Sequence, residues 1–502
     1  MMEKVKLTSW GFPEKIVDFY RRKGIHEFFE WQVQCLDLPG VLDGRNLVYS
    51  APTSAGKTMV SDVLLFKTLL ERKKKAIIIL PFVSIAVEKV NSMKQLLRRM
   101  GIRIDSFAGN SNPRGGFDQV DVAVCTIEKA NNMINRLTEE NKLSEVGIVI
   151  VDELHMIGDA NRGYLLELLL SKLLYINRKD REAGGDTVLQ IVGMSATIPN
   201  LADIAQWIDG ELFITDFRPV PLYQRIVYNG EVRQVDEVVL QQQQQQQQPV
   251  TEETALVLHS KLALAELAIK QDDAPLIYSA IETLVEGYSA LVFCSTKALC
   301  ERTSRSIAEN IYEFGAGKKA ARGERVAAIG RKLTETLDGK RILAVIQSLK
   351  RTAMGIDRNL ESVIRFGVAF HHAGLSTEER AIIEKAFRDG TIRILCSTTT
   401  LSAGVNLPAR RVLISTPLDF KGAMLDTTCY RQMVGRAGRK GIDNLGESML
   451  FCRTAAEYQR ALKWLVFADL SPVKSCLLAV SQQSSQPETT TTTATTTKTG
   501  EA

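Results

Sequence analysis

The sequence contains no long hydrophobic run. None of its apolar stretches reaches the roughly 20 residues that a membrane-spanning helix needs, and the N-terminus lacks the apolar stretch of a signal peptide. Its eight cysteines are scattered without a Cys-x-x-Cys pair, so neither a zinc pattern nor a disulfide framework is indicated. These absences predict a soluble protein of a reducing, intracellular compartment that does not act in a membrane.

The charge of the sequence shows no strong bias of either sign. A net charge of +5 permits a nucleic-acid partner but does not argue for one. The basic run at residues 72–75 has two interpretations, a nuclear signal or the exposed end of a helix, and the second is favoured because charge runs usually lie on solvated faces. At 502 residues the chain is too long for one ordinary domain.

Short apolar runs alternate with helical patterns in two successive series. Runs of about five apolar residues separated by helices are typical of parallel sheets covered on both faces, so the fold class is α/β. The first series predicts strands at residues 46–50, 76–80, 103–107, 121–125, 147–151, 190–194 and 212–215. The second predicts strands at residues 290–294, 366–370, 392–396, 411–415 and 447–452.

The domain boundaries follow from breaks in these patterns. The proline-containing connector at residues 217–221 ends the first series, which predicts domains at 1–217 and 218–478. A glutamine tract at 241–248 and a charged helical stretch at about 302–362 are predicted to be insertions in the second domain. The Ser/Thr-rich tail, residues 479–502, is predicted to be disordered.

A phosphate-binding loop is predicted between the first strand and a following helix. A strand, a loop of small residues and a helix that begins at Gly-Lys-Thr direct backbone N–H groups and the positive end of the helix dipole toward an anion. The predicted ATP contacts are Ala51, Pro52, Thr53, Ser54, Ala55, Gly56, Lys57 and Thr58. Lys57 is expected to reach the β- and γ-phosphates, and the Thr58 hydroxyl is expected to bind Mg²⁺.

Two carboxylates follow the apolar run that ends at Val151. The carboxyl end of a strand in an open parallel sheet is where such sheets bind ligands. Asp152 is therefore predicted to hold Mg²⁺ together with Thr58, and Glu153 to act as the base that activates the attacking water. A solvated strand end is the alternative, which the phosphate-binding loop upstream disfavours.

Three motifs resemble those of superfamily 2 helicases: Asp152-Glu-Leu-His155, Gly193-Met-Ser-Ala-Thr197 and Gln432-Met-Val-Gly-Arg-Ala-Gly-Arg439. The resemblance implies two tandem RecA-like domains with ATP in the cleft between them. It also implies that Gln432 belongs to the catalytic machinery and that Arg436 and Arg439 act as arginine fingers, with Arg439 the first choice. A guanidinium suits this role because its forked donors match phosphate oxygens.

Further strings extend the resemblance to nucleotide and strand contacts. Gln32 resembles an adenine-reading glutamine, whose amide can both donate and accept a hydrogen bond. Gly404 is implied at the nucleotide. The implied nucleic-acid contacts are Pro81, Phe82, Thr126, Ser295, Thr296, His372, Ser397, Thr398 and Phe420. A metal site at the adjacent histidines 371 and 372 is disfavoured, because no Cys or carboxylate set accompanies them at ligand spacing.

A narrower resemblance, over about residues 7–478, is to the helicase domains of the DNA polymerase theta and polymerase-theta-like family. It rests on strings such as 49–58, 152–158, 162–167 and 405–411. It implies a nuclear, ATP- and Mg²⁺-dependent 3′-to-5′ translocase on single-stranded or forked DNA, working with DNA-repair proteins at double-strand breaks or replication forks. Two alternatives remain open: an RNA helicase of the same superfamily, and a strand-annealing or scaffold module without hydrolysis.

Overall fold

The structure of the protein is a computed structural model. It describes residues 5–184, 189–236, 255–264, 273–318, 323–399, 407–468 and 471–477, together with residues 239, 269 and 401. The glutamine tract at 241–248, Gly404 and the tail at 479–502 lie outside the described residues.

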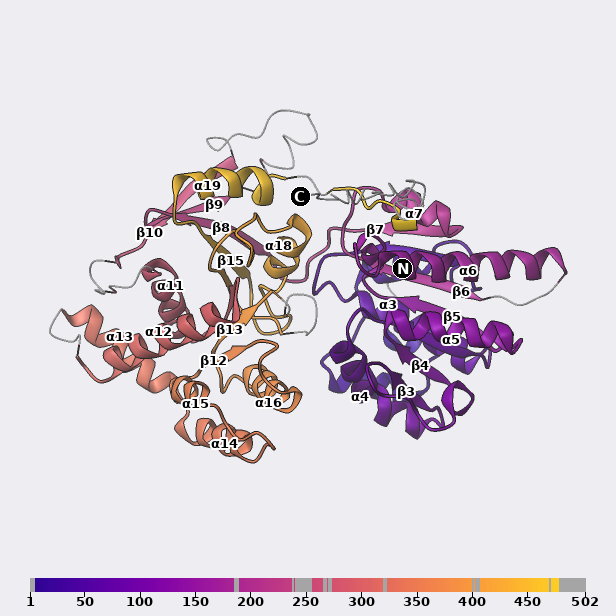
Figure 1. Ribbon diagram of the computed structural model, residues 1–502, viewed down its shortest axis with the longest axis horizontal. Coiled ribbons are helices and arrows are strands. Elements are labelled where there is room, and N and C mark those ends of the chain that lie inside the picture. The colour runs from indigo at the N-terminus through magenta and orange to yellow at the C-terminus, as the bar shows by residue number, and fades with distance from the viewer. Residues whose placement is uncertain are drawn as a thin grey trace, which may run out of the picture. The chain divides into compact units, whose positions relative to one another are not determined.

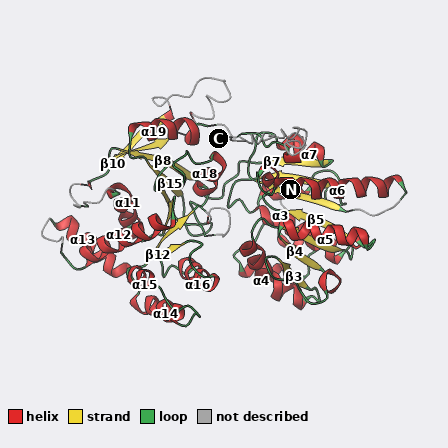
Figure 2. Ribbon diagram, in the orientation of Figure 1, coloured by secondary structure: helices red, strands yellow, loops and turns green. Residues whose placement is uncertain are grey.

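The chain forms two compact units. One contains Leu38–Tyr49, Val63–Leu212 and the segment from Pro472 on, and is called here the first-sheet unit. The other contains Met1–Asp37, Ser50–Asp62 and Phe213–Ser471, and is called the second-sheet unit. Each carries one large sheet with helices packed on it (Figures 1 and 2).

The first sheet has seven strands in the order β3-β4-β2-β5-β6-β1-β7. The registers of β3 with β4, β4 with β2, β2 with β5 and β5 with β6 are all parallel. Its strands are β1 (Asn46–Ser50), β2 (Lys75–Ile79), β3 (Ile104–Phe107), β4 (Val122–Cys125), β5 (Val146–Val151), β6 (Gln190–Ser195) and β7 (Gly210–Ile214). All seven strands predicted for this part of the chain are confirmed within about two residues, because the central ones are buried on both faces and read as continuous apolar runs.

Helices alternate with these strands. They are η1 (Leu7–Trp10), α1 (Glu14–Arg22), α2 (Glu30–Leu36), α3 (Lys57–Leu70), α4 (Val83–Arg99), η2 (Gly116–Gln119), α5 (Ile127–Glu139), η3 (Leu143–Glu145), η4 (Leu154–Gly158), α6 (Gly163–Glu182) and α7 (Leu201–Trp207). The long helix α6 packs on α5 and against η4, the short helix that directly follows the Asp-Glu pair. Its buried leucines, such as Leu166, Leu169 and Leu173, belong to the core under the first sheet.

The second sheet has eight strands in the order β10-β9-β8-β15-β14-β11-β13-β12. From β8 to β12 the neighbours pair in parallel, whereas β9 pairs antiparallel with both β8 and β10. The strands are β8 (Leu222–Tyr228), β9 (Glu231–Val235), β10 (Leu256–Lys261), β11 (Ala290–Cys294), β12 (Val368–His371), β13 (Ile394–Thr398), β14 (Arg411–Ile414) and β15 (Gly446–Phe451). The five strands predicted from residue 290 on are confirmed, and β8, β9 and β10 were not predicted.

The predicted helical stretch at about 302–362 lies between β11 and β12 and is helical. The described helices that follow β10 are α11 (Ala274–Val285), α12 (Lys297–Gly315), α13 (Glu324–Thr336), α14 (Gly339–Lys350), α15 (Arg358–Ile364), α16 (Thr377–Arg388), α18 (Thr427–Val434), α19 (Ala455–Ala461) and η6 (Leu462–Val466). One large hydrophobic core joins them to the second sheet.

Residues 472–477, called here the return segment, belong to the first-sheet unit although they follow the second sheet in the sequence. The side chain of Asn200 accepts a hydrogen bond from the Val473 amide at 2.9 Å and donates one to its carbonyl at 2.8 Å. The Glu167 carboxylate on α6 accepts hydrogen bonds from Ser475 Oγ at 2.6 Å, Cys476 N at 2.9 Å and Leu477 N at 3.2 Å. Val473 also packs on Gly158, so the return segment lies against η4.

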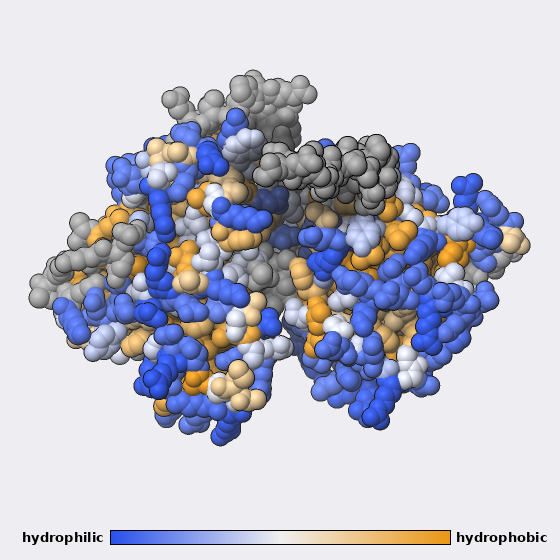
Figure 3. All heavy atoms as spheres, in the orientation of Figure 1, coloured by the Kyte–Doolittle hydropathy of each residue, from blue (hydrophilic) through white to orange (hydrophobic). Residues whose placement is uncertain are grey.

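The visible face of both units carries many hydrophilic residues, with hydrophobic side chains appearing between them (Figure 3). Within the described ranges, no helix has the length and apolar character required to cross a membrane.

Candidate functional site

The phosphate-binding loop has an unusual backbone conformation. It joins β1, which ends at Ser50, to α3, which begins at Lys57. Ser54 has a φ of 68° and Gly56 a φ of 88°, so the chain turns twice through the left-handed region before the helix starts. A Cβ on Gly56 would lie 2.9 Å from Nε2 of Gln32, which is a second reason for glycine at this position.

Lys57 folds back over this loop. Its Nζ donates a hydrogen bond to the carbonyl of Ala51 at 2.7 Å, which fixes the ammonium above the small residues of the loop. Ala51 and Ala55 are fully buried, so the loop backbone, rather than bulky side chains, forms the surface near the ammonium. N–H groups at the N-terminus of a fourteen-residue helix and a nearby cation are a donor set suited to phosphate.

Gln32 on α2 is bonded to the phosphate-binding loop. Its Oε1 accepts a hydrogen bond from the Phe29 amide at 2.8 Å, and its Nε2 donates one to the Gly56 carbonyl at 2.9 Å. Gln32 is buried, so its amide fixes the position of α2 relative to Gly56. Its predicted role as an adenine contact stays a prediction.

The two carboxylates follow β5 directly. The Asp152 amide donates to the Ile79 carbonyl at 3.0 Å, so the strand pairing with β2 continues to this residue. Glu153 has φ 54° and ψ 50°, a left-handed conformation that costs a residue with a Cβ about 1–2 kcal/mol. Strain of this kind clusters at functional sites, and here the strained residue is the predicted catalytic base.

His155 connects Glu153 with the Ser-Ala-Thr motif. Its Nδ1 lies 3.4 Å from Oε2 of Glu153 and accepts a hydrogen bond from the Ala196 amide, also at 3.4 Å. Gly193 lets η4 approach β6, because a Cβ at that position would lie 2.4 Å from Cδ2 of Leu154. The two motifs predicted at residues 152–155 and 193–197 are therefore in direct contact.

Arg162, which precedes α6, connects two predicted strand-contact segments. Its Nη1 donates to the Pro81 carbonyl at 2.6 Å, and its guanidinium lies 5.2 Å from the centre of the Phe82 ring. The same guanidinium is 3.9 Å from the carboxylate of Glu128, two residues after Thr126. Thr126 itself is buried at the start of α5. Arg162 thus positions Pro81 and Phe82 relative to α5.

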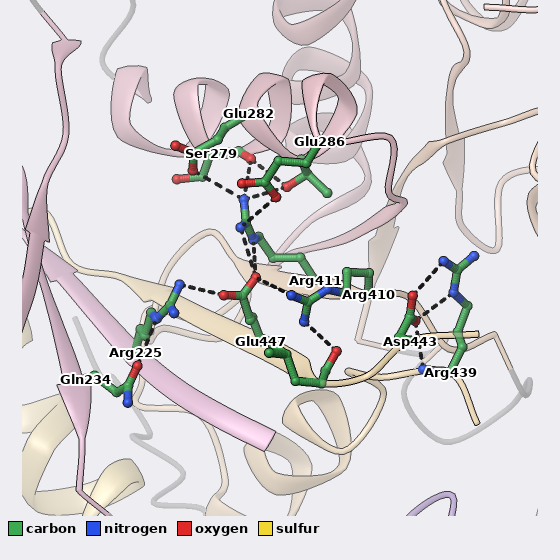
Figure 4. A network of polar contacts seen from close by, with 12 residues as sticks. Arg225, Gln234, Ser279, Glu282, Glu286, Arg410, Arg411, Arg439, Asp443 and Glu447 are labelled. Carbon is green, nitrogen blue, oxygen red and sulfur yellow. Dashed lines mark hydrogen bonds and ion pairs between the residues drawn. The ribbon is translucent and has the colours of Figure 1, made fainter. Parts of the chain in front are cut away.

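In the second-sheet unit, Gln432 and Arg436 lie on and just after α18, and Arg439 follows in a turn. The Arg439 side chain is bound on two sides by Asp443: Nε donates to Oδ2 at 2.8 Å and Nη2 donates to Oδ1 at 2.9 Å (Figure 4). The backbone amide of Arg439 also donates to Oδ2 at 2.9 Å. This fork-to-fork pairing gives the guanidinium a defined plane.

A buried ionic network supports the turn that carries Asp443. Glu447 on β15 accepts from Arg411 Nε at 3.0 Å and pairs with Arg225 of β8 at 2.7 Å (Figure 4). Arg411 also reaches Glu282 and Glu286 on α11, at 3.3 and 3.2 Å. Burial alone would raise the pKa of Glu447, but attraction by Arg411 and Arg225 outweighs it and lowers that pKa.

Several predicted nucleic-acid contacts are occupied by bonds within their own unit. Ser397 is fully buried and its hydroxyl donates to the His371 carbonyl at 2.9 Å. His372 is buried as well, and its Nε2 lies 3.2 Å from Oε1 of Glu301. Burial lowers the pKa of His372 although Glu301 acts in the opposite direction. Thr398 is also buried at the end of β13.

Other predicted contacts are accessible. Thr296 is exposed and caps α12 by accepting a hydrogen bond from the Leu299 amide at 3.1 Å, with Ser295 beside it. Phe420 is 70% exposed at the tip of a tight turn. The turn is closed by Asp419, whose Oδ1 accepts from the amides of Lys421 and Ala423 at 2.8 and 2.9 Å.

Sequence reasoning missed two residues that organise these segments, Arg162 and Asp443. Arg162 stands in a string that carries the family resemblance, but nothing in its spacing points to Pro81. Asp443 lies four residues after Arg439, which on a helix would suggest an ion pair. Because Gly441 lies between them, the sequence did not indicate a helix there.

The comparisons with known proteins agree with this geometry. Residues 31–204 match the DEAD/DEAH box helicase family, and residues 324–441 match the helicase conserved C-terminal domain. The chain therefore belongs to the superfamily 2 helicases.

Within that class it is similar to three groups of proteins. It is 44% identical over 487 residues to DNA polymerase theta of Mus musculus, which covers 95% of this chain and 18% of that protein. It is 33% identical to helicase POLQ-like of Homo sapiens, covering 94% of this chain and 39% of that protein. It is 29% identical to the ATP-dependent DNA helicase Hel308 of Thermoplasma volcanium, with 94% and 59% covered. The chain thus spans less than two thirds of the length of these relatives.

Proposed function

We propose that this chain is the ATP-hydrolysing motor of a DNA helicase. The observation that carries the proposal is the linked pair of motifs at residues 152–155 and 193–197, in which Glu153 is held in a left-handed conformation beside His155. A lone Asp-Glu at a strand end needs no such strain. The similarity to relatives such as the ATP-dependent DNA helicase Hel308 supports the same activity.

ATP is proposed to bind the loop from Ala51 to Thr58. In support, β1 and β5 belong to the same sheet. In addition, Gln190 at the start of β6 donates a hydrogen bond to the carbonyl of Arg45, which precedes β1. The carboxyl end of a strand is where open parallel sheets bind ligands, and both the loop and the Asp-Glu pair directly follow a strand of this sheet. Lys57 then neutralises phosphate charge, and backbone N–H groups at the start of α3 orient the phosphates.

Thr58 and Asp152 offer the hydroxyl and carboxylate oxygens that Mg²⁺ prefers, so these residues fit the metal. When bound, the metal would neutralise charge on the β- and γ-phosphates. Glu153 would accept a proton from the attacking water. His155, which contacts both residues, would transmit a movement of the Glu153 side chain to Ala196. Arg439, with Arg436, would stabilise charge on the transferred phosphoryl group.

The decisive experiment is an ATPase assay of three variants with and without single-stranded DNA. Lys57→Ala should abolish hydrolysis, because the phosphate contacts are lost. Glu153→Gln should bind ATP but not turn it over, because an amide cannot accept the proton. Lys67→Ala is the matched control, since Lys67 lies on the same helix and its ammonium forms an ion pair with exposed Glu71. Turnover near that of the parent in the first two variants would refute the site.

We further propose that the motor moves 3′-to-5′ on DNA, in double-strand break or replication-fork repair in the nucleus. Partial duplexes with a 3′ or a 5′ single-stranded end test the direction, and stimulation by RNA in place of DNA tests the alternative RNA helicase. Strand binding without any hydrolysis would favour the annealing or scaffold alternative.

The exposed turn around Phe420 is proposed to separate the first base pairs by contacting unstacked bases. Such a contact contributes about 1–3 kcal/mol per base. Shortening the loop between Asp419 and Ala423 should impair strand separation and spare DNA-stimulated hydrolysis. Unwinding by the shortened variant at the parent's rate would contradict this role.

A further inference from the structure

Asp443 is a buried carboxylate, and among the described residues its three side-chain hydrogen bonds all come from Arg439. Its side chain has no exposed surface, whereas that of its partner Arg439 is 19% exposed. Oδ2 accepts from both the backbone amide and Nε of Arg439, and Oδ1 accepts from Nη2. The carboxylate therefore binds the start and the end of the same arginine residue, and so restricts every torsion between them (Figure 4).

The pairing leaves part of the guanidinium available. A guanidinium has five N–H donors in one plane, and Asp443 uses the one on Nε and one on Nη2. The two donors on Nη1 and the second on Nη2 point away from the carboxylate and keep the forked geometry that suits phosphate oxygens. Arg439 is partly exposed and Asp443 is not, so solvent reaches the arginine side chain and not the carboxylate.

Asp443 is itself fixed by the backbone around it. At one end of its turn the Gly438 amide donates to the Ala409 carbonyl at 2.7 Å, and at the other the Gly446 amide donates to the Pro221 carbonyl at 2.7 Å. Gly438 has a φ of 90°, and a Cβ there would lie 2.7 Å from Val220. The guanidinium of Arg410 donates to the carbonyl of Leu445.

Glu447, four residues after Asp443, pairs with Arg411 and Arg225 (Figure 4). A buried carboxylate between two arginines would be costly to maintain unless each charge were compensated. The network therefore ties the end of the turn to β14 and β8. These buried ion pairs fix the position of the turn, and therefore the position of Asp443.

We propose that Asp443 is a positioning residue for Arg439, which orients the guanidinium before the nucleotide is engaged. The proposal rests on the function proposed above, in which Arg439 acts on the transferred phosphoryl group. A preoriented arginine stabilises the transition state without losing side-chain entropy at that moment, so Asp443 acts on the rate of hydrolysis and little on ATP binding.

The test is a double-mutant cycle on ATP hydrolysis at saturating single-stranded DNA. Arg439→Ala should lower kcat by about 10³-fold, as for other arginine fingers. Asp443→Ala should lower kcat by about 10²-fold, the cost of a small misplacement of a catalytic group, with KM nearly unchanged. The double variant should be no slower than Arg439→Ala alone, because Asp443 has nothing left to position.

Asp443→Asn is the conservative variant. Its one amide oxygen can accept from Arg439, while its NH₂ group faces donors, so kcat should lie between those of the parent and Asp443→Ala. A further full loss of rate when Asp443→Ala is added to Arg439→Ala would overturn the proposal, since Asp443 would then act independently of Arg439. A parallel rise in KM, or parent-like kcat in Asp443→Ala, would overturn it as well.

Lys57→Ala separates this proposal from the function on which it rests. If Lys57→Ala hydrolyses ATP like the parent, the proposed ATP site is wrong. If Lys57→Ala is inactive and Asp443→Ala is fully active, the ATP site stands and only the positioning role fails.

Discussion

The two units hold their functional turns by different means. In the first-sheet unit, the turn after β5 is fixed by close packing and by hydrogen bonds to backbone groups, as at Gly193 and Ala196. In the second-sheet unit, the turn after Arg439 is fixed by a network of buried charges around Glu447. The first turn depends on the volume of closely packed side chains and the second on the balance of buried charges. The two turns should therefore be destabilised by different substitutions.

The largest effect is expected from breaking the charge balance. Arg411→Met keeps most of the side-chain volume but removes a cation that contacts three carboxylates. Removing one partner of a buried pair costs about 3–5 kcal/mol, and we expect the lower end because Arg225 still faces Glu447. Urea unfolding of the whole chain, followed by its midpoint and slope, measures the loss.

Arg178→Ala is the control for that measurement. Arg178 and Glu182 form an ion pair on α6 whose side chains are 82% and 63% exposed. Pairs of this kind contribute about 0–1 kcal/mol. If Arg411→Met were as mild as Arg178→Ala, the network would not be what holds the second turn.

The next effect tests the dependence on volume. Gly163 begins α6, and a Cβ there would lie 2.1 Å from the Ile157 carbonyl oxygen and 3.0 Å from the Cys476 sulfur. Because the oxygen belongs to backbone, Gly163→Ala should destabilise the first-sheet unit by about 1–3 kcal/mol, as overpacking does. Thermal unfolding monitored by circular dichroism measures the change.

The matched control is Gly339→Ala, because Gly339 also begins a helix, α14, and no atom lies within 4 Å of its Cβ position. That variant should be neutral or more stable by about 0.4–1 kcal/mol. Equal losses in the two alanine variants would mean that helix-start glycines matter for backbone conformation and not for packing.

A smaller and more local effect is expected at the return segment. Glu167→Ala removes the acceptor for Ser475, Cys476 and Leu477, whose groups can turn to water instead, so the net loss should be about 1–2 kcal/mol. Hydrogen exchange should show lost protection at Cys476 and Leu477 while the core of the first sheet keeps its own. Glu182→Ala, farther along the same helix, should leave both amides protected.

The sequence predicted the first sheet better than the second for a physical reason. The central strands β2 and β5 of the first sheet are almost entirely apolar, so the sequence alone identifies them as buried strands. Strand β8 contains Arg225, whose side chain is 11% exposed and pairs with Glu447, and hydropathy cannot show such a pairing. Strand β10 is mostly exposed, and its apolar residues are limited to positions 256–258, which is too short a run to predict a strand.

The site divides in the same way. Motif spacing correctly placed Lys57, Asp152 and Glu153 shortly after buried strands, while the roles given to them stay predictions. It could not predict that Arg162 reaches Pro81, which is 81 residues away in the sequence. Contacts of that range depend on how helices pack on the sheet, and nothing in the local pattern encodes them.

The smallest expected effect concerns a single charge in the second-sheet unit. Burial lowers the pKa of His372 below its usual value, and Lys297 and His371 act in the same direction, while Glu301 opposes them. Above an unfolded-state pKa of about 6.5 both states are neutral and the contribution of His372 to stability is complete. As the pH falls below that value, the unfolded state binds a proton first, and stability is lost until the lowered folded-state pKa is reached.

His372→Gln should therefore reduce the loss of stability on acidification from pH 7, measured by urea unfolding without nucleic acid. The change should be smaller than that of Arg411→Met at any pH, since one partly compensated imidazole is involved and not a network. An unchanged pH profile in His372→Gln would show that other groups, such as the carboxylates around Arg411, govern the response of the second-sheet unit to acid.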